Sequence, residues 1–328
     1  MAAVDSFQFL YTEIARSCNS YFETLALVGA VYTASRAAVL LRDCCTLVRV
    51  HFLPRMMPSR RLAQRFGQWA VIYGASEAIA KAYAEELARQ GINIIFVSQD
   101  NAAVRDAALS LSQSYGVETV IVEADFTLGQ VAGKPVKDAL RGKDVGFLVN
   151  CVDESLAFPQ SLIEVSEQDL LDLVNRNVAA ITLMTRLVLP GMVERSRGAV
   201  VNISSGACCQ PLPGRVTLSA STGYLDHFSR ALHLEYGCRG IYVQSLIPFQ
   251  VASSGRPPSA SSSSSPAAAA AHGWLVPKPE VYARHAISTL GISHRTTGYW
   301  PHTLQYGLMR CIPEWIWVPA SRMLLSSS

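Results

Sequence analysis

Two stretches of the sequence combine residue types that could do chemistry. The first is Gly74-Ala75-Ser76, a turn between an apolar run and an amphipathic segment. Such a turn lets the backbone approach a phosphate, and the N-terminus of the following helix favours negative charge. The second is Asn202-Ile203-Ser204-Ser205-Gly206, where a predicted strand ends in hydroxyl groups. Ser205 is either a reactive group or a hydroxyl that satisfies local backbone groups.

The helix predicted after the second stretch offers Ser205 neither an acid nor a base. Leu218 and Thr222 are four residues apart, so they lie one turn apart on one helical face. Leucine has no proton to give, and threonine carries no charge. Tyr224 lies about 120° further round the helix, so its phenol points elsewhere. These two positions therefore offer Ser205 neither a proton donor nor a cation.

Apolar strands alternate with amphipathic helices through most of the chain. The predicted strands are Trp69–Tyr73, Ile92–Ser98, Thr119–Glu123, Val145–Asn150, Ala199–Ile203 and Ile241–Ile247. The predicted helices are Ala78–Gln90, Val104–Tyr115, Val136–Leu140, Glu167–Leu189, Leu218–Tyr236 and Pro279–Leu290. This alternation is typical of a parallel sheet with helices on both faces. We expect an α/β protein with a doubly wound parallel sheet, the Rossmann fold.

Changes in composition divide the chain. Residues 1–66 are an apolar N-terminal extension and linker, and residues 67–328 are the Rossmann domain. A serine- and alanine-rich tract, residues 255–273, is a low-complexity insertion in that domain. The tail from Tyr299 to Leu325 is rich in tryptophan, which suits either packing on the domain or a membrane interface.

The N-terminal extension is most apolar between Tyr21 and Leu41. Glu23 and Arg36 shorten its cleanest part below the roughly 20 residues of a bilayer span. Three interpretations stay open for this segment. It is a membrane-associated helix through residues 21–41, an organelle-targeting segment, or a helix packed on the domain.

The bulk composition narrows the classes of function. A net charge of +3 is too small to imply a nucleic-acid partner. Half of the residues are apolar and 16% are charged, which indicates a large buried core and additional apolar surface. The eight cysteines form no C-x-x-C pair, and no histidine lies at zinc-ligand spacing from them. We expect no metal site and reduced thiols, as in an intracellular compartment.

From about residue 67 to 250 the sequence resembles the short-chain dehydrogenase/reductase family. In that family a serine ends a strand, a tyrosine acid/base follows thirteen residues later, and a lysine four residues after it. The resemblance implies that Ser205 and Asn177 are remnants of the catalytic set. Leu218 replaces the tyrosine, and Thr222 replaces the lysine. Loss of the acid/base alone costs about 10²–10⁴ in rate.

The same resemblance identifies the remnants of a cofactor site. The family loop T-G-x-x-x-G-x-G keeps Gly74 here and replaces its other two glycines with Ala78 and Ala80. A left-handed conformation at Ala78 would cost about 1–2 kcal/mol. Asp153 adds a carboxylate along the expected path of the dinucleotide. The positions matched to this degenerate site are Gly74, Ser76, Ile79, Asp125 and Asn150. We expect no cofactor, with weak NADP or NAD binding left open.

Further stretches resemble an inactive branch of the family near the 17β-hydroxysteroid and 3-ketoacyl reductases. They are Glu13–Asn19, Tyr224–Leu232, Val243–Phe249, Ser288–Ser293 and Pro313–Trp315. This resemblance implies a mitochondrial location, with the endoplasmic reticulum membrane as the alternative. It also implies a homodimer through residues 167–189 and 218–236, where Leu225, Phe228, Leu232 and Tyr236 are either interface or core.

Taken together, these features predict a pseudoenzyme that acts by binding a protein partner or a lipid-like ligand. The alternative is an NADP(H)-dependent steroid or 3-ketoacyl reductase with an unorthodox acid. Cofactor binding and turnover separate the two hypotheses.

Overall fold

The computed structural model describes residues 2–56, 62–75, 77–99, 101–124, 126, 133–153, 161–252, 274–313, 315–317 and 319. The chain divides into two compact units, Met1–Phe52 and Leu53–Ser328. The predicted insertion at 255–273 lies outside the described residues.

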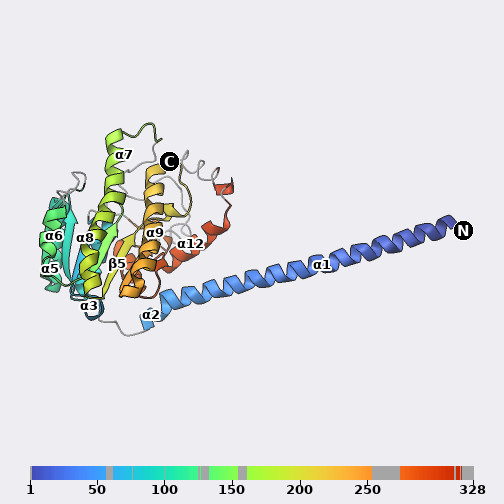
Figure 1. The fold of residues 1–328 in the computed structure, drawn as a ribbon, viewed down its shortest axis with the longest axis horizontal. Coiled ribbons are helices and arrows are strands. Elements are labelled where there is room, and N and C mark those ends of the chain that lie inside the picture. The colour runs from blue at the N-terminus through green and yellow to red at the C-terminus, as the bar shows by residue number, and fades with distance from the viewer. Residues whose placement is uncertain are drawn as a thin grey trace. The chain divides into compact units, whose positions relative to one another are not determined.

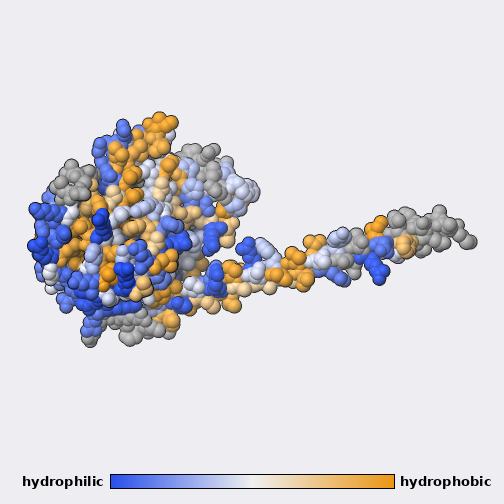
Figure 2. Space-filling view, in the orientation of Figure 1, coloured by the Kyte–Doolittle hydropathy of each residue, from blue (hydrophilic) through white to orange (hydrophobic). Residues whose placement is uncertain are grey.

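The first unit is a long helix with an exposed apolar surface. Helix α1 (Ala2–Leu47) continues into the π-helix η1 (Val48–Phe52). Within it, Tyr21–Phe52 is long and apolar enough to cross a membrane, a test that a targeting segment near an N-terminus also passes. Hydrophobic residues are visible along this helix in Figure 2.

The second unit is built on a seven-stranded parallel sheet, with the strand order β3-β2-β1-β4-β5-β6-β7 (Figure 1). The strands are β1 (Trp69–Tyr73), β2 (Asn93–Ser98), β3 (Thr119–Glu123), β4 (Val145–Cys151), β5 (Gly198–Ile203), β6 (Ile241–Leu246) and β7 (Arg295–Thr296). The order reverses between β1 and β4, which confirms the predicted doubly wound fold.

Helices cover both faces of this sheet. They are α4 (Ala78–Arg89), α5 (Asn101–Tyr115), α6 (Gly133–Leu140), α7 (Glu167–Val174), α8 (Ile181–Glu194), α9 (Val216–Tyr236), α11 (Pro279–Ser288) and α12 (Trp300–Cys311). Neighbouring side chains of a strand enter opposite layers, because side chains alternate across a sheet. In β1, Ile72 packs in the core under α4 and α11, whereas Val71 packs in the core under α8 and α9.

Two segments differ from the sequence-based expectation. The predicted helix 167–189 is α7 and α8 joined by a π-helical turn, η3 (Asn175–Ala180), and it extends to Glu194. Within the expected linker, α2 (Leu53–Met56) and α3 (Leu62–Arg65) are helical, and Leu62 and Phe66 belong to the core.

The stripe considered as either interface or core on α9 is core for two of its members. Leu225 and Leu232 are buried, while Phe228 and Tyr236 are partly buried and pack on the same cluster. The exposed apolar side chains of this region belong to other positions, among them Leu171, Val174, Val216 and Tyr224.

Candidate functional site: a vacated reductase centre

Ser205 lies just beyond the carboxyl end of β5, the edge where open parallel sheets bind ligands. Its backbone is extended, and a single 3-10 turn, η4 (Gly206–Cys208), follows. The N–H of Gly206 donates to the carbonyl of Pro248 at 2.7 Å, which ties the turn to the end of β6. A Cβ at Gly206 would lie 2.9 Å from the Phe249 ring, so this close approach requires glycine.

The position at which the family resemblance places the acid/base holds a buried leucine. The side chain of Leu218 is only 4% exposed, on the first turn of α9. One turn later, Thr222 is fully buried, and its hydroxyl donates to the Leu218 carbonyl at 2.9 Å. The hydroxyl is therefore used inside the helix. Beside Leu218 the cavity between α9 and the loop of Leu162 and Val165 holds about 20 Å³, room for about one water molecule.

Tyr224 does not replace the missing acid. Its hydroxyl hydrogen-bonds Thr182 on α8 at 2.8 Å, and its ring stacks on Phe228 with a centroid distance of 5.6 Å. This orientation confirms the prediction from helical spacing that the phenol points away from Ser205.

Asn177 is buried in the π-helical turn η3, and both polar atoms of its side chain hydrogen-bond the backbone of one residue, Asp153. Its Oδ1 accepts from the Asp153 N–H at 2.7 Å, and its Nδ2 donates to the Asp153 carbonyl at 3.0 Å. The Asp153 carboxylate forms an ion pair with Arg176. The negative charge expected along the dinucleotide path is thus balanced by an adjacent guanidinium.

The turn after β1 keeps its glycine, Gly74. Ala78, however, does not adopt the left-handed conformation that was considered for it. Gly74 has φ +80°, and a Cβ there would lie 2.6 Å from the Cys151 carbonyl oxygen, so only glycine fits. Ala78 begins α4, and Ser196 is the only non-glycine residue with positive φ among the residues that the structure describes. The left-handed penalty therefore does not arise. Ala80 is fully buried in the core.

The other matched cofactor positions are only partly accounted for. Ile79 is half-buried against the core. Asn150 is fully buried and donates to Asn202 Oδ1 at 2.8 Å, and Asn202 in turn donates to the Ser229 hydroxyl at 2.8 Å. This network turns both amides into the interior between β4, β5 and α9. Ser76 and Asp125 lie outside the described residues.

Sequence reasoning missed a pair of thiols beside this centre. The sulfur atoms of Cys208 and Cys209 lie 3.6 Å apart immediately after Ser205. The hydrogen bond between them, together with burial, raises the pKa of Cys208 well above its ordinary value. The same bond lowers the pKa of Cys209. The adjacency of the two cysteines was the only sequence signal for this pair.

A partly buried ion pair was also missed. Arg295 Nε donates to Asp226 Oδ1 at 2.9 Å, and Ser245 Oγ donates to the same oxygen at 2.7 Å. The three residues come from β7, α9 and β6, so the pair joins elements that are distant in sequence. Hydrogen bonds to Asp226 and Tyr306 raise the pKa of Arg295 against the effect of its burial.

Comparison with known proteins gives the fold and the family. The model for short chain dehydrogenases matches residues 68–261. The chain is 58% identical over 323 residues to "Inactive hydroxysteroid dehydrogenase-like protein 1" of Danio rerio, covering 98% of each chain. The mouse protein of the same name is 51% identical, with 99% of this chain and 96% of the mouse chain covered.

Active relatives are more distant. The "Very-long-chain 3-oxoacyl-CoA reductase" of Rattus norvegicus is 37% identical, over 77% of this chain and 78% of its own. A solved 7β-hydroxysteroid dehydrogenase structure matches with a TM-score of 0.68 at 22% identity, over 79% of this chain and 98% of that one, and shows the fold. The chain belongs to the short-chain dehydrogenase/reductase family, as a pseudoenzyme member.

Proposed function

We propose that the chain acts by binding, as a membrane-associated scaffold that presents the reductase fold to a partner without reducing a substrate. The buried Leu218 carries this proposal, because no proton donor occupies its position and Thr222 supplies no charge to activate one. Two relatives that match over nearly their full length are named inactive, which supports the same conclusion.

A lipid-like molecule is the class of small ligand that we favour for this chain. The 37% identical relative is named for a very-long-chain 3-oxoacyl-CoA, a substrate with a long apolar chain. The exposed apolar surface of α1 would place the chain at a membrane, where such molecules reside. We propose the mitochondrion as its location, with the endoplasmic reticulum as the alternative.

The protein partner that we propose is a second copy of this chain. Helices α7 and α9 lie side by side (Figure 1) and expose Leu171, Val174, Val216 and Tyr224. Figure 2 shows hydrophobic residues gathered over this part of the surface. An apolar patch on adjacent helices suits a two-fold interface, in which the same patch is used on both copies.

The decisive experiment measures cofactor binding and turnover together. Purified full-length chain in detergent is titrated with NADPH by fluorescence and calorimetry, and then mixed with a ketosteroid or a 3-ketoacyl-CoA. We expect weak or no nucleotide binding and NADPH oxidation no faster than without protein. Tight binding with accumulation of the alcohol would overturn the scaffold proposal in favour of an unorthodox reductase.

A further inference from the structure

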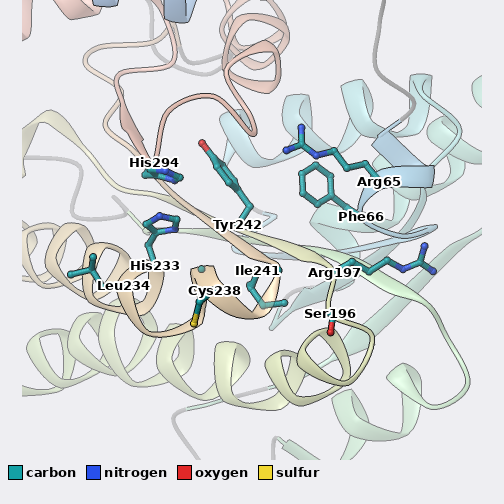
Figure 3. A pocket seen from close by; sticks show the side chains of 12 residues that line it. Arg65, Phe66, Ser196, Arg197, His233, Leu234, Cys238, Ile241, Tyr242 and His294 are labelled. Atoms are coloured by element: carbon teal, nitrogen blue, oxygen red, sulfur yellow. The ribbon is translucent and has the colours of Figure 1, made fainter.

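A second cavity lies at the opposite end of the sheet from Ser205. It is formed at the amino ends of β5 and β6 and has a volume of about 570 Å³ (Figure 3), within the range of small-molecule sites. The six residues of β5 separate it from Ser205 by about 20 Å. It is therefore independent of the vacated centre and of the function proposed for it.

The lining of this cavity is cationic. It includes two arginines and two histidines and no carboxylate. Arg197 is balanced by Asp144, with a nitrogen–oxygen distance of 2.9 Å. Arg65 forms no ion pair within the part of the chain that the structure describes, so its charge is left to solvent or to a ligand.

Packing fixes Arg65 in place. Its guanidinium lies 4.9 Å from the centre of the Phe66 ring. A Cβ on Gly291, where φ is +81°, would lie 2.5 Å from Arg65 Nη1, so the guanidinium packs directly over this glycine. An arginine held in this way loses little side-chain entropy when it binds an anion.

Two stacked imidazoles form the other wall. The rings of His233 and His294 lie 3.5 Å apart, and Tyr242 packs against His294 at 4.9 Å. Figure 3 shows the Tyr242 ring between the histidines and the Arg65–Phe66 pair. Burial, and then the neighbouring His233, lower the pKa of His294, because two cationic rings at this distance would repel each other.

His233 presents a hydrogen-bond donor to the cavity. Its Nδ1 is buried and has no hydrogen-bond partner among the described residues. The ring makes no other hydrogen bond in that part of the chain, so Nε2 is its accessible nitrogen. A neutral ring with its proton on Nε2 can donate that proton to an anion in the cavity.

We propose that this cavity binds a small phosphate monoester, with the phosphate paired to Arg65 and the organic part of the ligand extending over the Tyr242 ring toward His233. Guanidinium groups match phosphate oxygens in a bidentate geometry, which favours phosphate over a neutral polar group. The half-buried Tyr242 ring offers an apolar surface to the organic part of the ligand. The assignment rests on the unpaired guanidinium, the accessible imidazole nitrogen and a lining without a carboxylate.

The test uses phenyl phosphate as the probe and full-length chain in detergent, measured by calorimetry. We expect saturable binding with Kd at or below about 1 mM. Arg65→Gln and His233→Gln should each weaken it by about tenfold, which is 1.4 kcal/mol. Arg105→Gln is the matched control, because Arg105 is also exposed but lies on α5. Its affinity should equal that of the wild type.

Three ligand controls complete the test. Phenol should not bind measurably, and inorganic phosphate and benzoate should bind more weakly than phenyl phosphate. Arg65 is exposed, so its substitution leaves the core intact even where the His233 variant fails to fold. Absence of phenyl phosphate binding, equal affinity in Arg65→Gln and wild type, or equal affinity for inorganic phosphate would overturn the assignment.

Discussion

At the scale of single residues, the vacated centre has become part of the core. Leu218 is buried in the first turn of α9, and Thr222 returns its hydroxyl to the same helix. Spacing alone predicted that both side chains share one helical face. It could not predict where the two amides point, because Asn150 and Asn177 form hydrogen bonds with neighbours 52 and 24 residues away.

Restoring the missing chemistry is the first prediction at this scale. The combined variant Leu218→Tyr, Thr222→Lys, Ala78→Gly and Ala80→Gly returns a phenol, its activating cation and the glycine loop. We expect NADPH oxidation with a 3-ketoacyl-CoA at least about 10² faster than for the unmodified chain, the lower end of a general acid's contribution. The control carries only the two loop glycines and should stay inactive.

That prediction depends on space around the phenol. Tyrosine is larger than leucine, and overpacking a core position costs about 1–3 kcal/mol. Circular dichroism and thermal unfolding would show whether the variant folds. A folded variant that reduces no ketone would contradict the prediction and show that the rest of the pocket has diverged as well.

The second prediction concerns the adjacent thiols. The hydrogen bond from Cys208 lowers the pKa of Cys209, so a larger fraction of Cys209 is thiolate at neutral pH. Peptide mapping after limited iodoacetamide treatment should find Cys209 alkylated well before Cys208. The rate for Cys209 should begin to rise at lower pH than the rate for Cys208.

Cys208→Ala removes the donor and provides the test of cause. It should slow alkylation of Cys209 by roughly threefold or more at pH 7. Cys44 and Cys45 are the internal control, because they are adjacent and exposed on helix α1 and no hydrogen bond joins their sulfur atoms in the part of the chain that the structure describes. Equal rates at Cys208 and Cys209, or no effect of Cys208→Ala, would contradict the prediction.

At the scale of elements, the sequence predicted the strands and helices that have a clear hydrophobic pattern and missed the elements that are too short or too irregular to have one. Six of the strands are mainly apolar, and each was predicted to within about two residues. Strand β7 has two residues, too few to form a pattern. The π-helical turn η3 was also missed, because one extra residue in a turn leaves the composition unchanged.

The prediction at this scale concerns His302, which anchors α12. Its Nδ1 accepts from the Phe249 N–H at 3.3 Å, so the neutral ring carries its proton on Nε2, 3.2 Å from the Leu275 carbonyl oxygen. Burial lowers the pKa of His302 from 6.5 to about 4. In the unfolded chain the same ring takes up a proton below about 6.5.

The sign follows from this difference. The neutral ring favours the folded state above pH 6.5, and that contribution is lost as the pH falls from 6.5 toward 4. The loss is limited to about 3 kcal/mol, at about 1.4 kcal/mol for each unit of pKa. Urea unfolding at pH 7.5 and pH 5 should show a smaller pH dependence for His302→Gln than for the wild type. If the free energy of unfolding depended on pH identically in the two proteins, the role of His302 would be contradicted.

At the scale of the whole molecule, a first prediction tests the proposed dimer. Leu171 and Val174 are about half exposed on α7. Changing both to glutamate would bury charge in a two-fold interface, so Leu171→Glu with Val174→Glu should convert dimer to monomer. Leu109→Glu, on the exposed face of α5, is the control and should leave the dimer unchanged. Light scattering in detergent measures the mass, and a monomeric wild type would exclude the proposal.

The last prediction is that a membrane covers the apolar surface of α1. Deleting residues 1–50 should move the protein from the membrane pellet to the supernatant after alkaline extraction of cells, if Tyr21–Phe52 is its anchor. An arginine at the centre of a spanning helix costs about 2.5–3.5 kcal/mol, so Val31→Arg should also reduce the membrane-bound fraction. Thr12→Arg lies outside the apolar stretch and should have no effect. An unchanged distribution of the truncated chain would contradict the anchor. Separating mitochondria from endoplasmic reticulum in the same preparation would decide between the two membranes.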